Sequence, residues 1–200
     1  MNRNRLLAVL LVPVAAASLS GCGVNSIPTA EENVKARWAD VQADYQRRAN
    51  LIPNIVSTVK GAAASEQNIL VGVTEARANA TKITLSGDQL SDPKAMASFA
   101  DAQNRLTLSL QRLQEAYPQL QSQGNFKSLI DELEGTENRI RIDIRDYNSA
   151  VQAYNTRIRT FPDVIGAKVF YGAKPMVPYA ATTPNAEAAP TVSFDTNTSR

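Results

Sequence analysis

The chain contains no histidine and only one cysteine among its 200 residues. Histidine is the commonest general base and the commonest metal ligand, so its absence removes histidine-dependent catalysis and histidine-containing metal sites. A single cysteine cannot form a disulfide within the chain. These absences favour a protein that is not an enzyme and that uses neither a cofactor nor a metal ion.

The chain also lacks an excess of charge of either sign, with 21 basic and 19 acidic side chains. Two of the basic residues, Arg3 and Arg5, lie in an N-terminal leader, and without them 19 basic residues face 19 acidic ones. Binding to nucleic acid requires a basic surface. We therefore expect no nucleic-acid partner.

The N-terminal apolar run, residues 6–18, is shorter than the roughly 20 residues that a transmembrane helix needs. It follows the basic stretch "MNRNR", and this order is typical of a secretory signal peptide. The run ends in "LSGC", which resembles the bacterial lipobox, where the signal is cut before the cysteine and the sulfur receives diacylglycerol. The sequence thus predicts a signal peptide over residues 1–21 and a lipid on Cys22; the alternative is an ordinary signal followed by an unrelated cysteine.

Lipid attached to Cys22 would hold the protein on a membrane, because each buried acyl CH₂ contributes about 0.8 kcal/mol. Residues 22–29 are then a lipidated tether outside the cytoplasm. Gly23 follows the cysteine where an aspartate would favour retention in the inner membrane. In a Gram-negative cell this favours the periplasmic face of the outer membrane.

Three long segments carry apolar residues at alternating steps of three and four, which is typical of coiled-coil-like helices. The first begins at Thr29, where Glu32 completes a possible capping box, and its pattern is broken only by Arg48 and Glu66. The second opens at Asp92-Pro93, an N-cap followed by proline at the first helical position. The three segments are residues 30–85, 93–117 and 126–161.

The first segment would be about 84 Å long as one helix, whereas the third would span about 54 Å. A break near Pro53 or Gly61 would divide it and give four helices, and we favour that arrangement. The predicted fold is all-α, an antiparallel up-and-down bundle of three to four long helices over residues 30–175. Residues 176–200 are rich in alanine, threonine and proline, and we expect them to form a disordered tail.

The stretch "ELEGTENRI", residues 132–140, places four charged residues inside the third helix. If the helices are antiparallel, Glu137 lies level with residue 107 and about one turn from Glu66. Such a buried polar layer sets helix register and requires a cation between the carboxylates, for which Arg139 or Arg77 could serve. The candidate residues for this layer, or for a docking face, are Arg48, Glu66, Arg77, Glu134, Glu137, Asn138 and Arg139.

Two further features of the third helix need an explanation. Gly135 disfavours a helix interior by about 1 kcal/mol relative to alanine, and either close helix approach or a local irregularity would account for it. Tyr147-Asn148 and Tyr154-Asn155 are spaced by seven residues, which places both tyrosines on the apolar seam with hydrogen-bonding asparagines beside them.

Five motifs follow one another along the chain: "RRANLIPNIVSTVKG" (47–61), "TEARANA" (74–80), "ELEGTENRI" (132–140), "YNSAVQAYNTRIRTFP" (147–162) and "FYGAKP" (170–175). Their order and spacing resemble those of the LemA family. The resemblance implies a membrane-attached, extracytoplasmic helical bundle and no reaction. Many family members begin with a transmembrane helix, whereas this chain begins with a lipobox.

Three functional hypotheses follow. We favour a non-enzymatic, lipid-anchored scaffold or adaptor of the bacterial envelope that binds another envelope protein. The alternative is an enzyme or ligand carrier that uses the polar cluster between Glu132 and Arg139. A third hypothesis is a structural rod that associates with copies of itself.

Overall fold

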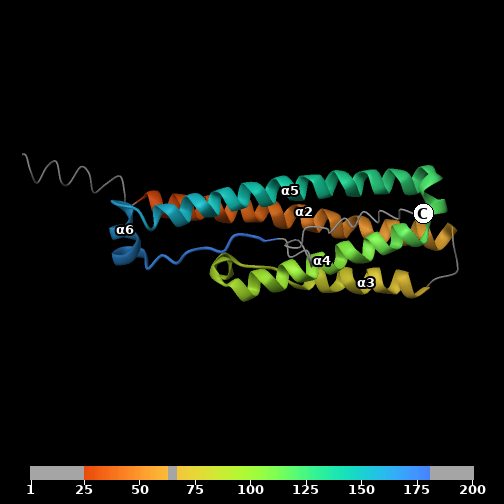
Figure 1. Ribbon diagram of the computed structural model, residues 1–200, viewed down its shortest axis with the longest axis horizontal. Helices are drawn as coiled ribbons and strands as arrows, with labels where there is room; N and C mark the ends of the chain where they lie inside the picture. The colour runs from red at the N-terminus through yellow and green to blue at the C-terminus, as the bar shows by residue number, and fades with distance from the viewer. Residues whose placement is uncertain (1–24, 63–66, 181–200) are drawn as a thin grey trace, which may run out of the picture.

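The computed structural model describes residues 25–62 and 67–180, in which four long helices and no strands are present. The four helices are α2 (Ser26–Ala62), α3 (Gln67–Lys82), α4 (Pro93–Ala116) and α5 (Gly124–Arg157). Helices α2 and α5 lie side by side along the length of the molecule, and α3 and α4 form a second antiparallel pair beside them (Figure 1). The predicted all-α bundle is confirmed, in its four-helix form.

Helix α2 ends at Ala62, next to the predicted break at Gly61, and Pro53 remains inside it. Proline has no N–H, so the carbonyl of Ala49 loses the partner that residue 53 would otherwise provide. Arg77 of α3 donates its Nε–H to that carbonyl at 2.7 Å. Pro53 as the break point is therefore wrong, because a neighbouring helix satisfies the group that proline leaves free.

Helix α2 begins at Ser26, earlier than the predicted start at residue 30. Ile27 is fully buried, and the hydroxyl of Thr29 donates to the carbonyl of Asn25 within the first turn, so it does not cap the helix. The tether predicted over residues 22–29 is therefore too long. The predicted signal peptide and Cys22 lie outside the described residues.

The predicted N-cap of α4 is confirmed, because Asp92 accepts a hydrogen bond from the backbone N–H of Lys94 at 2.9 Å. A short 3₁₀ helix, η1 (Gly87–Ser91), precedes it, and a second, η2 (Pro118–Ser122), joins α4 to α5. Pro118 thus ends α4, as its fixed φ and missing N–H predict.

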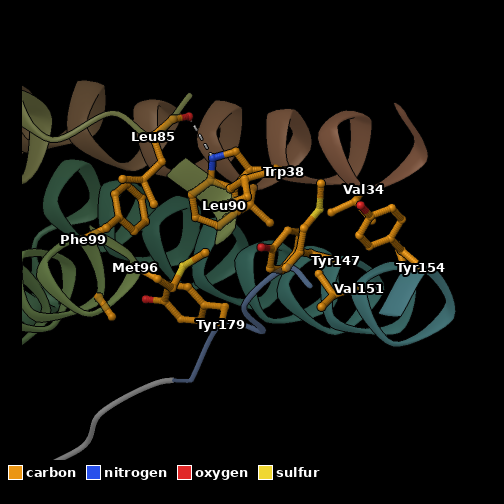
Figure 2. Packing of buried hydrophobic residues seen from close by; sticks show 14 of the residues in the cluster. Val34, Trp38, Leu85, Leu90, Met96, Phe99, Tyr147, Val151, Tyr154 and Tyr179 are labelled. Atoms are coloured by element: carbon orange, nitrogen blue, oxygen red, sulfur yellow. Dashed lines mark hydrogen bonds between the residues drawn. The ribbon is translucent and has the colours of Figure 1, made fainter. Parts of the chain in front are cut away.

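The buried residues form two adjoining clusters along the bundle. One contains a group of packed aromatic rings among aliphatic side chains: the Trp38 ring lies 5.2 Å from Phe99 and 5.0 Å from Tyr147, centroid to centroid (Figure 2). The other is mostly aliphatic and includes Leu110. Offset and edge-on aromatic pairs add to the stabilisation from buried area, typically by about 0.5–1.5 kcal/mol each.

The predicted seams are largely buried, with one clear exception at the end of the third. Trp38, Leu110 and Tyr154 are all in the core. Phe161 is 80% exposed, because α5 ends at Arg157 and the chain turns before reaching it.

After α5 the chain forms a corner from α6 (Asp163–Gly166) and the π-helical turn η3 (Ala167–Tyr171). Gly172 then adopts a φ of 56°, which only glycine adopts without strain, and the chain reverses direction. Residues 173–180 run without helix or strand over the bundle, and we call them the C-terminal strap. The disordered tail predicted from residue 176 is wrong where it is described, because Met176 and Tyr179 are buried; residues 181–200 lie outside the described residues.

Candidate functional site

A buried arginine on α2 collects polar groups from two other helices. Arg48 is only 1% exposed, and its Nη1 donates to Glu137 Oε1 at 2.8 Å and to Thr107 Oγ1 at 3.0 Å. Its Nη2 donates to Gln103 Oε1 at 2.6 Å. We call these four residues, Arg48, Gln103, Thr107 and Glu137, the Arg48 layer. A buried cation is tolerated only with partners of this kind.

Gln103 extends this layer to the fourth helix. Its Nε2 donates to the carbonyl of Ala80 at 3.3 Å, close to the end of α3, where helix carbonyls lack an intrahelical partner. The Arg48 layer therefore contacts all four long helices and fixes their relative positions along the bundle.

The sequence predicted the level of this layer but not its cation. Glu137 and Thr107 both accept hydrogen bonds from Nη1 of Arg48, so they lie at the same position along the bundle axis, as the antiparallel geometry indicated. The cation is Arg48, however, and neither Arg77 nor Arg139 reaches Glu137. Arg77 is used to satisfy the Ala49 carbonyl.

The other candidates of the third helix face outward. Glu134, Asn138 and Arg139 are exposed. Asn138 accepts a hydrogen bond from Arg141 at 3.2 Å, and the Nε of Arg139 lies 3.8 Å from Asp44 Oδ2. Glu66 lies outside the described residues.

Beside Arg139, two carboxyl groups meet between α2 and α5. Asp44 is 6% exposed, and Asp143 lies close enough to share a hydrogen bond with it. Burial raises the pKa of the Asp143 carboxyl, and the hydrogen bond and negative charge of Asp44 raise it further. The pair is stabilised when one of its members is protonated.

A tyrosine pair connects the Arg48 layer to the C-terminal strap. The Arg48 guanidinium carbon lies 4.8 Å from the centre of the Tyr45 ring, within the range of a cation–π contact. The hydroxyls of Tyr45 and Tyr179 are hydrogen bonded at 2.8 Å. Burial raises the pKa of both tyrosines, so both remain neutral in the folded protein.

Asn148 and Asn155 hold the strap through their side-chain amides. Asn155 donates to the carbonyl of Met176 and accepts from its N–H, both at 2.8 Å. Asn148 makes the same pair of bonds with Tyr179, at 2.9 and 2.8 Å. Seven residues of helix and three residues of extended chain both span about 10 Å, so the two spacings match.

Sequence reasoning identified these asparagines as hydrogen-bonding neighbours of core tyrosines but missed their partner. The signal was the seven-residue repeat itself. A polar side chain that returns on the same face of the helix after two turns suits an extended segment running along the helix.

A shallow groove lies between α4 and α5 on the surface above the Arg48 layer. We call it the α4–α5 groove, and its lining residues are Thr107, Leu110, Gln111, Gln114, Leu133, Glu134, Glu137 and Arg141. Glu137 belongs to both features: it binds the buried Arg48, and 28% of its side chain is exposed. The groove therefore combines apolar and charged groups above a rigid base.

No group of three or more His, Cys, Asp or Glu side chains is placed to hold a metal ion in residues 25–62 and 67–180. In this same part of the chain, no helix has the length and apolar character required to cross a membrane. The charge of Arg48 is neutralised by Glu137.

Comparison with known proteins matches most of this chain. The model of the LemA family matches residues 37–194. Magnetosome protein MamQ 1 and Magnetosome protein MamQ 2 of Paramagnetospirillum magneticum are each 26% identical to it over 161 residues. The matches cover 69% of this chain and 58% of each relative, so the chain spans less than two thirds of the relatives' length.

Proposed function

This chain belongs to the LemA family, and from that premise we propose that it is a lipid-anchored scaffold of the bacterial envelope that binds another envelope protein through its α4–α5 groove. Family membership supports an envelope-associated, non-enzymatic protein. The proposal adds two properties to this: a lipid anchor and a protein partner.

The anchor is assigned to Cys22, which ends the leader and begins the tether. The prediction is that the mature chain starts at this residue and carries diacylglycerol on its sulfur. Mass spectrometry of the protein purified from bacterial membranes tests this, with Cys22→Ser as the matched control. An unmodified Cys22 in the mature chain contradicts the anchor.

One observation carries the scaffold function: both terminal nitrogens of the buried Arg48 are bound to side chains of other helices. Arg48 binds Glu137, Gln103 and Thr107, and these groups join helices. Side chains that hold the helices together in this way make the bundle rigid, which suits a protein that offers a fixed surface to a binding partner. The alternative of an enzyme or ligand carrier has less support, because Glu132 and Glu134 are exposed and the carboxylate of Glu137 is bound to Arg48.

The α4–α5 groove is the surface that we assign to the partner. Leu110 and Leu133 form an apolar base, while Glu134 and Arg141 supply charges of both signs at the rim. An apolar centre with a polar rim is typical of non-obligate protein interfaces. Glu137 stiffens the groove because its carboxylate is held from below by Arg48.

Site-specific crosslinking in intact cells tests this assignment. A photoreactive amino acid placed at Glu134 in the groove, or at Asn138, which is hydrogen bonded to the groove residue Arg141, should give one discrete crosslinked product. The matched control is Glu75, an exposed glutamate of α3. If Glu75 gives the same product, or if Glu134 and Asn138 give only the diffuse products of random neighbours, the groove is not the binding surface.

The third hypothesis, a rod that associates with itself, predicts a different product. The crosslinked species would then have the mass of two copies of this chain. Measuring the mass of the acylated protein in detergent separates this outcome from binding to another protein.

A further inference from the structure

One end of the rod exposes an unusual concentration of large apolar side chains. Five of them occur within eleven residues after α5 and are between 43% and 80% exposed. We call these residues the apolar tip: Phe161, Ile165, Val169, Phe170 and Tyr171. The other large exposed hydrophobic residues of the described chain, Val71, Leu108 and Ile142, lie on three different helices. Clustered exposed apolar groups of this kind mark interaction surfaces.

The start of the described chain lies beside this tip. Ser26 Oγ donates to Asp163 Oδ2 at 2.9 Å, and Arg157 Nη1 donates to the carbonyl of Ser26 at 3.1 Å. Gly166 packs against Ile27. Figure 1 shows the same arrangement, with α6 at the end of the rod where α2 begins and α5 ends.

This neighbourhood sets how far the proposed lipid can be from the tip. Cys22 precedes Ser26 by four residues, and four extended residues span at most about 14 Å. That distance is less than half of the roughly 30 Å thickness of a bilayer's hydrocarbon core. Acyl chains on Cys22 would therefore bring the apolar tip to the surface of the same bilayer.

The charges around the tip also suit a membrane surface. Between residues 157 and 174 the chain carries four basic side chains, Arg157, Arg159, Lys168 and Lys174, against the single acidic Asp163. Basic side chains near anionic lipid headgroups contribute about 1 kcal/mol each, and aromatic rings favour the headgroup boundary. The tip thus combines the two features of an interfacial anchor.

We propose that the apolar tip inserts into the interfacial region of the lipid bilayer, as a second contact beside the lipid on Cys22. The rod then stands end-on to the membrane, and the α4–α5 groove is held away from the surface. This inference deepens the proposed function and takes the anchor at Cys22 as its starting point. The occupant is a bilayer because the proposed lipid and the basic flank both lie at this end.

A fluorescence experiment tests insertion without depending on acylation. The chain from residue 22 to residue 200, with Cys22→Ser, is held by an N-terminal histidine tag on vesicles of phosphatidylethanolamine, phosphatidylglycerol and a nickel-chelating lipid. An environment-sensitive fluorophore is attached at Val169→Cys. Val71→Cys, an equivalent replacement of an exposed valine on α3, is the matched control.

Insertion predicts a blue shift of the fluorophore at residue 169 and strong quenching by nitroxide groups on the lipid acyl chains. The fluorophore at residue 71 should remain in water. Adding Phe170→Asp should lower the equilibrium constant for insertion, measured from the quenching at residue 169, at least about tenfold, the factor expected from losing roughly one buried aromatic side chain. Phe170 is exposed, so circular dichroism should show an unchanged helical content.

Three results would overturn the inference. In the first, the two fluorophores respond alike. In the second, Phe170→Asp leaves the quenching at residue 169 unchanged, which would mean that the tag alone brings the fluorophore to the bilayer. In the third, the fluorophore is protected without vesicles and becomes exposed on dilution, which would assign the tip to a second copy of the chain. Absence of lipid on Cys22 contradicts the anchor, whereas these results contradict the tip.

Discussion

Replacing Glu137 should destabilise the protein more than replacing Arg48, although the two residues form the same ion pair. The asymmetry comes from their exposure: the Arg48 side chain is 2% exposed, whereas that of Glu137 is 28% exposed. Glu137→Ala leaves a buried cation without its counter-ion. Arg48→Met leaves a carboxylate that water can reach, and the methionine side chain fills much of the vacated volume.

The magnitudes follow from the contacts of each group. Breaking a buried ion pair by removing one partner costs about 3–5 kcal/mol. Arg48 keeps its bonds to Gln103 and Thr107 in the Glu137→Ala variant, so we expect the lower end, about 3 kcal/mol. For Arg48→Met the main loss is the unsatisfied buried amide oxygen of Gln103, which costs about 1–2 kcal/mol.

Denaturant unfolding followed by far-UV circular dichroism measures both free energies of unfolding, in a Cys22→Ser background. Arg105→Ala is the control, because the Arg105–Asp101 pair is exposed and its loss should fall near experimental error. The double variant should cost less than the sum of the two single variants. The reasoning is refuted if Glu137→Ala costs no more than Arg105→Ala, or if Arg48→Met is the more damaging change.

Three other changes have definite expected outcomes. Gly135→Ala should raise the free energy of unfolding by up to about 1 kcal/mol, because α5 is continuous at this position and no atom lies within 4 Å of the added methyl group. A loss of stability would show instead that the glycine is needed for packing. Asn155→Ala removes both hydrogen bonds to Met176, so it should lower the free energy of unfolding by about 1–2 kcal/mol. It should also make the strap easier to cleave in limited proteolysis, and unchanged cleavage would contradict the role of the asparagine. The raised pKa of Asp143 means that its neutral form stabilises the fold; that contribution is complete below the ordinary value of 3.8 and is lost as the pH rises through the raised pKa. Asp143→Asn should therefore stabilise the protein at neutral pH, and unfolding measured against pH should show this gain shrinking towards acid pH.

The helical core could be predicted because its signal is periodic and local. Alternating three- and four-residue steps identified the buried faces around Trp38, Leu110 and Tyr154 without any knowledge of their partners. The same periodicity placed Glu137 level with residue 107. Once the lengths of antiparallel helices are known, the position of each residue along the bundle axis can vary little.

The partners of the polar residues could not be predicted in the same way. Arg48, Arg77 and Arg139 are chemically alike, and which one meets Glu137 depends on how the helices are rotated about their axes. For Arg77 a signal was present: Pro53 removes one N–H, so one carbonyl of α2 needs a donor from elsewhere.

The C-terminal strap was missed because its own composition carries no folding signal. Residues 173–180 contain two prolines and only three larger apolar side chains, Met176, Val177 and Tyr179, with no helical or strand-like periodicity. Their order comes from Asn148 and Asn155, which lie at least twenty residues earlier in the chain. Local composition cannot predict that a segment is ordered when its order depends on hydrogen bonds to residues far away in the sequence.

The pairing of the first helix with the last segments of the fold determines when the protein can finish folding. Tyr45 meets Tyr179, and Ser26 meets Asp163, across separations of 134 and 137 residues. The hairpin of α3 and α4 can form as soon as these two helices have been synthesised. Helix α2 keeps one apolar face exposed until α5 and the C-terminal strap have also been synthesised. Apolar surface exposed in this way promotes aggregation of incompletely folded chains. Truncation before Tyr179 should leave the rings of Trp38, Tyr45 and Phe99 without one of their packing partners.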